Sequence, residues 1–97
     1  MMFEYDPIKS AANLDKHGIS LQDATCLWFE ESLEIEARTE DEPRFMIIGP
    51  IGDDLYSCVY TLRGDTIRLI SARRSHKKEK ELYYDHFKEL ENKSSGI

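Results

Sequence analysis

Apolar residues recur with two different periods along this chain, and the change of period separates helical from strand segments. From Asp6 to Gly18 and from Ser20 to Trp28, apolar residues return every three or four positions, which predicts two amphipathic helices. From Leu33 to Ala37 the period is two, because apolar residues alternate with glutamates. This alternation predicts a half-exposed strand, so the chain changes from helix to sheet just before Leu33.

Residues that favour helix termini mark the ends of both helices. Asp6 followed by Pro7 predicts the start of the first helix, since aspartate caps a helix and proline is tolerated at its first position. Gly18 predicts the end of this helix. Ser20 with Asp23 approximates a capping box for the second helix. Both helices are too short to be stable alone, so we expect them to pack on a sheet.

Three further strands follow, each rich in apolar and β-branched residues. A polar turn from Thr39 to Pro43 precedes the first of them. The last two are joined by a tight hairpin in which Gly64 is expected to take a positive φ. The strands are predicted at Arg44–Gly49, Leu55–Leu62 and Thr66–Ala72.

Polar, helix-favouring residues after the last strand predict a third helix, for which Ser75 is the expected cap. Four strands joined by short turns predict an antiparallel sheet that the two N-terminal helices cover on one face. We therefore expect an α+β fold of order ααββββα. It forms a single domain over residues 1–91, followed by a flexible C-terminal tail at 92–97.

The composition is that of a soluble cytoplasmic domain. Hydrophobic residues make up 40% and charged residues 33% of the 97 residues, which suits one modest hydrophobic core. No apolar run approaches the roughly 20 residues that span a bilayer, and the N-terminus lacks the pattern of a signal peptide. Cys26 and Cys58 have no metal-ligand spacing, so we expect two buried thiols and neither a metal site nor a cofactor.

Positive charge is concentrated in one stretch of an otherwise acidic chain. Residues 63–80 contain seven lysines or arginines and two acids, a net charge of +5 in a chain of net charge −6, so the other residues sum to −11. This balance argues against a protein that coats nucleic acid over its whole surface. It is compatible with a local phosphate-binding site, and the acidic remainder would suit a basic protein partner.

Side chains of the strand 66–72 should alternate between the two faces of the sheet. Ile67 and Leu69 would point to the helix-covered core, whereas Arg68, Ile70 and Ala72 would point to the other face. Arg68 then lies in mid-strand on the less covered face.

The end of this strand brings further candidate groups. Arg73 and Arg74 follow it, and Glu79 and Tyr83 lie one helical turn apart on the next helix. With Arg68, these groups could bind a phosphodiester and perform acid–base chemistry on it. The structural alternative is a solvated charge run with Tyr83 packed in the core.

Four segments of the sequence resemble the BrnT family of bacterial type II toxins. They are Phe3–Ser20, the region from Pro43 to Gly49, Thr61–Gly64 and Ile67–Tyr83, in the order and spacing of the family. Members of this family resemble RelE-type toxins, which implies a small twisted antiparallel sheet with helices.

The resemblance also implies an activity and a partner. The implied activity is that of a metal-independent ribonuclease that halts translation, cleaving RNA, free or on the ribosome, with the RNA's own 2′-hydroxyl as the nucleophile. The implied partner is a BrnA-like antitoxin of the ribbon-helix-helix type, whose DNA-binding dimer inactivates the toxin and represses the shared operon. DNA would be contacted only through the antitoxin.

Site residues follow from the same resemblance. Histidine suits proton transfer near neutrality, although a helix-terminal histidine such as His17 is more often structural. Arg44 matches the family's arginine before the second strand, where an ion pair is an equal alternative. The implied catalytic residues are Arg68, Arg73, Arg74, Glu79, Tyr83 and His17, and the implied RNA-binding residues are Lys16, Arg44, Arg63, Lys77 and Lys78.

Two features depart from the family, and they support a rival interpretation. Glu81 and Leu82 stand where relatives are more basic, and the pI near 5.0 is low for a ribonuclease. The rival is a non-catalytic interaction module that acts as a co-repressor partner through its acidic surface. An open groove in which Arg68, Arg73, Glu79 and Tyr83 converge would favour the enzyme, whereas ion pairs that bury the two arginines would favour the rival.

Overall fold

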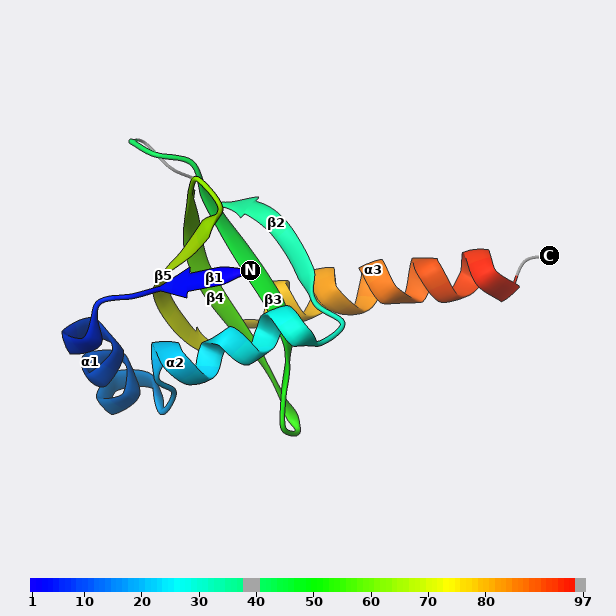
Figure 1. Ribbon diagram of the computed structural model, residues 1–97. Helices are drawn as coiled ribbons and strands as arrows, with labels where there is room; N and C mark the ends of the chain where they lie inside the picture. Colours follow the sequence, from blue (N-terminus) through cyan, green and yellow to red (C-terminus); the bar gives the residue numbers. More distant parts are fainter. Residues whose placement is uncertain (38–40, 96–97) are drawn as a thin grey trace.

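A computed structural model describes the backbone of residues 1–37 and 41–95 and the side chains up to residue 91. It shows an α+β fold, as predicted, built on one twisted sheet with helices on both sides (Figure 1). The sheet has five strands in the order β1-β5-β4-β3-β2. In chain order the elements are β1 (Met2–Glu4), α1 (Pro7–His17), α2 (Leu21–Ala24), the 3-10 helix η1 (Thr25–Phe29), β2 (Leu33–Ala37), β3 (Arg44–Ile51), β4 (Asp54–Arg63), β5 (Thr66–Arg74) and α3 (Lys77–Ser95).

The first strand corrects the predicted order ααββββα and the predicted purely antiparallel sheet. β1 pairs in parallel with β5, with Phe3 opposite Ile67 and Glu4 opposite Arg68. The other three pairings are antiparallel, so the sheet is mixed. A strand of three residues is too short to show a period of two, and the sequence therefore gave no sign of it.

The helix ends are where the sequence places them, but the second helix is not continuous. The Asp6 carboxylate accepts the backbone N–H of Ile8 at 2.8 Å, and Gly18 ends α1 with φ 75°. The Ser20 hydroxyl accepts the backbone N–H of Asp23 at 3.0 Å. The predicted helix from Ser20 to Trp28 is in fact one turn of α-helix, α2, followed by the tighter helix η1.

A buried asparagine fastens α1 to β5 at a point that β1 does not reach. The Asn13 side chain donates to the carbonyl of Ala72 at 2.8 Å and accepts the N–H of the same residue at 3.2 Å. It also donates to the carbonyl of Ile19 at 2.8 Å. Asn13 therefore satisfies the backbone of β5 in place of a neighbouring strand.

The hydrophobic core lies between one sheet face and the segment formed by α1, α2 and η1. Leu21, Leu27 and Cys58 are fully buried, and Trp28 packs edge-on against Phe3 and Tyr60 at ring-centre distances of 5.3 and 5.0 Å. We call this side of the sheet the covered face. Its buried members are Ile19, Leu21, Ala24, Leu27, Ile47, Cys58, Tyr60, Ile67, Leu69 and Ala72.

A β-bulge in β5 corrects the predicted orientation of one side chain. Tyr60 pairs with Leu69, but Val59 pairs with Ser71, so Ile70 is the extra residue. The bulge reverses the alternation beyond it. Ala72 is therefore buried in the core and does not share a face with Arg68 as predicted.

The connections and the last helix complete the comparison with the sequence. Gly64 has φ 61° in the hairpin between β4 and β5, as predicted. The predicted turn from Thr39 to Pro43 lies partly outside the described residues. α3 continues to Ser95 and so takes in most of the predicted tail, whose flexibility stays a prediction. Only the start of α3 approaches the sheet, and the rest projects away from the body (Figure 1).

Candidate functional site

The sheet face opposite the core carries three rows of cross-strand neighbours. The row nearest α3 joins Leu33, Ile48, Ser57 and Arg73, and the middle row joins Ile35, Met46, Val59 and Ser71. The row farthest from α3 contains Ala37 and Arg44, then Thr61, Arg68 and Glu4. We call this side the open face.

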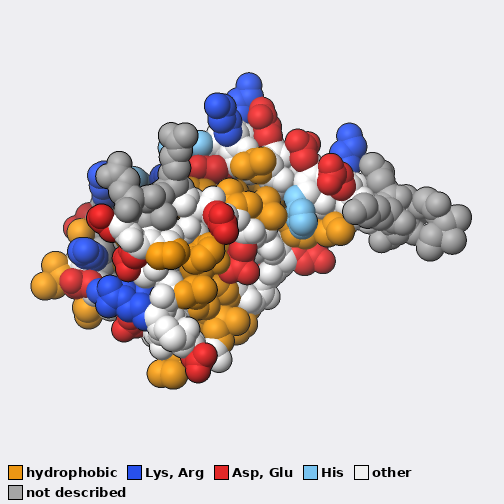
Figure 2. Space-filling view, turned by 90° about the horizontal axis from the view of Figure 1, so that it is seen from above, with side chains coloured by type: hydrophobic (Ala, Val, Ile, Leu, Met, Phe, Trp, Pro, Cys, Tyr) orange, Lys and Arg blue, Asp and Glu red, His pale blue; other side chains and the backbone are white. Residues whose placement is uncertain are grey.

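The open face is buried at its two ends, beside α3 and at Thr61 in the far row, which is 2% exposed. Ile48 is fully buried and Ser57 is 2% exposed, although neither belongs to the core cluster of the other face. In the middle row, Ile35, Met46 and Val59 are only partly buried. Figure 2 shows hydrophobic side chains gathered across the body of the molecule, with charged side chains set among them. The middle of the open face is thus accessible to a ligand.

Arg73 is held at the α3 end by a network of charged and polar groups. Its two terminal nitrogens donate to the two Glu79 carboxylate oxygens at 2.7 and 2.8 Å. Glu79 also accepts the Ser57 hydroxyl at 2.9 Å and the backbone N–H of His76 at 2.8 Å. The Ser57 hydrogen points to Glu79, so Ser75, with its oxygen 2.7 Å from that of Ser57, is the donor to Ser57.

This network changes the expected roles of two residues. Ser75 does not cap α3 as predicted; instead Glu79, in the first turn, accepts the N–H of His76. The hydrogen bonds from Arg73 lower the pKa of Glu79 to about 2, and those from His76 and Ser57 act in the same direction. A carboxylate with so low a pKa is a poor proton acceptor near neutral pH. Glu79 is therefore suited to orienting Arg73.

Tyr83 lies one turn further along α3. Its hydroxyl donates to the backbone carbonyl of Glu31 at 3.0 Å, and its ring packs on Phe87 at 4.6 Å between ring centres. Burial raises the pKa of the Tyr83 phenol, and the negative charge of Glu31 adds to this effect. Tyr83 thus stays protonated near neutral pH, and its hydroxyl ties the base of α3 to the segment before β2.

Two arginines lie at the far end of the open face. Arg68 is 3.6 Å from the Glu4 carboxylate in a partly exposed ion pair. Arg44 begins β3, and Thr61 bonds to the preceding carbonyl, that of Pro43, at 2.7 Å. Thr61 thus lies between Arg44 and Arg68 and brings the two arginines close together. Sequence reasoning missed this proximity because the pairing of β3 with β4 creates it. Arg68 is five residues from Arg73, roughly 16 Å along the strand, so the four residues proposed to converge do not meet at one point.

The remaining predicted residues lie elsewhere. Arg74 is exposed and pairs with Asp54 at 3.2 Å. Arg63, Lys77 and Lys78 are exposed at the hairpin and at the start of α3, and Lys16 is exposed at the end of α1. His17 is partly buried at the end of α1, which packs on β5 from the side of the covered face.

The described residues also bear on two other kinds of site, metal sites and membrane spans. No group of three or more histidines, cysteines or carboxylates could hold a metal ion there, and no helix there is long and apolar enough to cross a membrane. Both thiols are free; Cys58 is buried as predicted, but Cys26 is exposed, contrary to the prediction.

Fold and site together define a small α+β domain whose sheet presents arginines on a largely open face. A model of the family described as "Ribonuclease toxin, BrnT, of type II toxin-antitoxin system" matches residues 5–79. Because this match covers more than half of the chain, the chain belongs to the BrnT family of type II toxins. The family is one of ribonuclease toxins, and its system implies an antitoxin partner. No curated protein matches the chain.

Proposed function

We propose that this protein is an endoribonuclease toxin that cleaves RNA on the open face of its sheet. The observation that carries the proposal is the placement of three arginines on that face, two at one end and one at the other. Guanidinium groups bind phosphate with paired hydrogen bonds. Membership in a family of ribonuclease toxins supports RNA as the ligand.

In this proposal the protein supplies charge and orientation, and the RNA supplies the nucleophile. The 2′-hydroxyl of the RNA gives its proton to water and attacks the adjacent phosphorus, and the bond from phosphorus to the 5′-oxygen breaks. Negative charge builds up on the phosphate oxygens, and a fixed Arg73 stabilises it. Glu79 acts as a positioning residue, since two hydrogen bonds hold the Arg73 fork in place. Proton transfer to the leaving oxygen is assigned to Tyr83, and His17, on the side of the covered face, takes no part in this step.

Arg44 and Arg68 would bind neighbouring parts of the RNA strand in the same proposal. Both stand beside Thr61, away from the Arg73 network, so they would contact other nucleotides than the one that is cleaved. No metal ion takes part in any of these steps. A ribbon-helix-helix antitoxin would inactivate the toxin, and the RNA would be cleaved free or on the ribosome.

Growth and RNA integrity after induced expression test this proposal. The variant is Arg44→Ala with Arg68→Ala, because both arginines are at least partly exposed and neither belongs to the Arg73 network. Lys9→Ala with Lys88→Ala removes the same charge from exposed positions on α1 and α3. We expect arrest and shortened RNA from the wild type and the lysine variant, and loss of both from the arginine variant. Arrest by the arginine variant would contradict the proposed surface.

The ion pairs of the arginines favour a second candidate function. Arg73 is fully paired with Glu79 and Arg68 is partly paired with Glu4, which is the arrangement expected of a non-catalytic interaction module. Such a module would act as a co-repressor partner. A folded wild type that neither arrests growth nor shortens RNA, and that strengthens operator binding by the antitoxin, would support this second function in place of the first.

A further inference from the structure

The edge strand β2 has an unpaired side. β2 is last in the strand order, and all five of its residues pair with β3 in a continuous register from Leu33 with Ile48 to Ala37 with Arg44. In the part of the chain that the structure describes, no strand pairs with its other side (Figure 1). Proteins protect such edges with short strands, charged side chains, proline or a bulge. β2 has no proline and no bulge, and its charged side chains are both glutamates, which repel an acidic strand but not a basic one.

The charge around β2 selects which kind of strand could be added. Residues 30–37 and 41–42 contain six acids and no lysine or arginine, a net charge of −6 that equals the charge of the whole chain, so the other residues are neutral in sum. Glu34 and Glu36 on β2 itself are exposed. Glu34 is also fixed, because it accepts the Tyr60 hydroxyl at 2.5 Å. Like charge disfavours RNA or a second copy of β2 here and favours a basic polypeptide.

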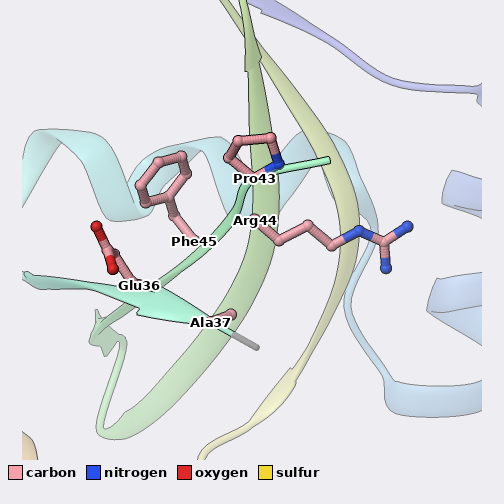
Figure 3. Close-up of a pocket in the computed structure, with 5 residues that line it drawn as sticks. All are labelled: Glu36, Ala37, Pro43, Arg44 and Phe45. Carbon is pink, nitrogen blue, oxygen red and sulfur yellow. The ribbon is translucent and has the colours of Figure 1, made fainter. Parts of the chain in front are cut away.

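A pocket lies beside β2. It has a volume of about 170 Å³ and is lined by Glu36, Ala37, Pro43, Arg44 and Phe45. In Figure 3 the Glu36 carboxylate and the Phe45 ring lie on the same side, and the Arg44 guanidinium points away from both. An aromatic ring beside a carboxylate suits the apolar stem and the cationic head of a lysine or an arginine.

We propose that β2 binds an extended polypeptide segment rich in lysine or arginine, which adds to the sheet as a sixth strand. Backbone hydrogen bonds to β2 supply its alignment. Glu34 and Glu36 pair with its basic side chains, and one of these enters the Phe45 pocket. The segment is taken to belong to the antitoxin, and this assignment alone rests on the proposed function. The site lies on the acidic edge of the sheet and not on the arginines of the open face.

Binding of a synthetic probe tests the inference. The probe is a decapeptide of alternating arginine and valine, and its matched control carries N-methyl groups on alternate amides, which removes hydrogen-bond donors and keeps the charge. We expect the probe to shift the backbone NMR signals of Leu33–Ala37 and to protect their amides from exchange. Equal binding of the N-methylated control would show attraction by charge alone and would overturn the strand addition, as would no binding of the probe.

Variants locate the site and separate this inference from the proposed function. Glu34→Gln with Glu36→Gln should weaken probe binding about two- to thirtyfold, since an exposed charge pair contributes ~0.2–1 kcal/mol. Asp15→Asn with Glu89→Gln removes the same charge from α1 and α3 and should leave binding unchanged. The variant with Glu34→Gln and Glu36→Gln should still arrest growth. If the wild type binds the probe at β2 without arresting growth, the proposed function fails and the inference stands.

Discussion

The covered face of the sheet buries Leu27, Ile47 and Cys58 almost completely, whereas the middle of the open face leaves Ile35, Met46 and Val59 in partial contact with water. The residues of the two faces alternate along the same strands. Three helical segments cover the first face, and only the start of α3 approaches the second. The covered face therefore supplies most of the stability, and the open face is available for binding.

The largest expected effect comes from the covered face. Leu27→Ala removes a fully buried side chain from the middle of the core and should lower the free energy of unfolding by about 2–5 kcal/mol. Val59→Ala on the open face removes fewer methyl groups from a partly exposed site and should cost about 1 kcal/mol or less. Urea denaturation measures both. Equal losses would show that the open face is packed as tightly as the core.

The next effect tests the asparagine that closes the edge of β5. Asn13→Ala leaves the N–H and C=O of Ala72 without their side-chain partner and should cost about 2–3 kcal/mol. Gln22→Ala removes an exposed amide from α2 and should cost less than about 0.5 kcal/mol. Thermal denaturation compares the two variants. A small loss for Asn13→Ala would mean that water replaces its hydrogen bonds.

A smaller effect on stability is expected at Glu79, which holds Arg73 on the open face, and this effect should depend on pH. The folded pKa of Glu79, about 2, lies below its ordinary value of 4.5. Its stabilising contribution is therefore complete above about pH 4.5 and is lost as the pH falls towards 2. Allowing for solvent screening, we expect about 1–2 kcal/mol. Glu79→Gln should lose this amount near neutral pH and converge with the wild type in acid, as followed by urea denaturation. Parallel pH curves would exclude the depressed pKa.

The sequence predicted the helices, strands and turns that depend on local pattern. The helix caps at Asp6 and Ser20 and the turn at Gly64 follow from the chemistry of single residues. The strands β2 to β5 follow from their apolar content and alternation. These signals are contained within one element, so a single sequence suffices to find them.

Contacts between distant segments were not predictable in this way. The partner of Asn13 is 59 residues away, and the bulge at Ile70 is defined by the register of β4. The same holds for the site. Arg73 and Glu79 were found as candidates because they lie in one strand–helix unit of the segment that resembles the family. The proximity of Arg44 to Arg68 arises only through strand pairing. Whether any of these residues acts on RNA stays a prediction.

The smallest expected change in stability is at Arg68, and it sharpens the contrast between the faces. Its pair with Glu4 is 3.6 Å long and both side chains are 30–40% exposed, so solvent screens it strongly. Arg68→Ala should therefore lower the free energy of unfolding by less than about 0.5 kcal/mol. Glu4→Gln, which breaks the same pair and keeps the arginine, is the matched control. If Arg68 serves RNA binding and not stability, Arg68→Ala weakens growth arrest and Glu4→Gln does not. The melting temperatures of both variants then stay within a few degrees of that of the wild type. A large loss of stability in both variants would instead assign Arg68 to the fold, and the open face would then keep only Arg44 and the paired Arg73 for its ligand.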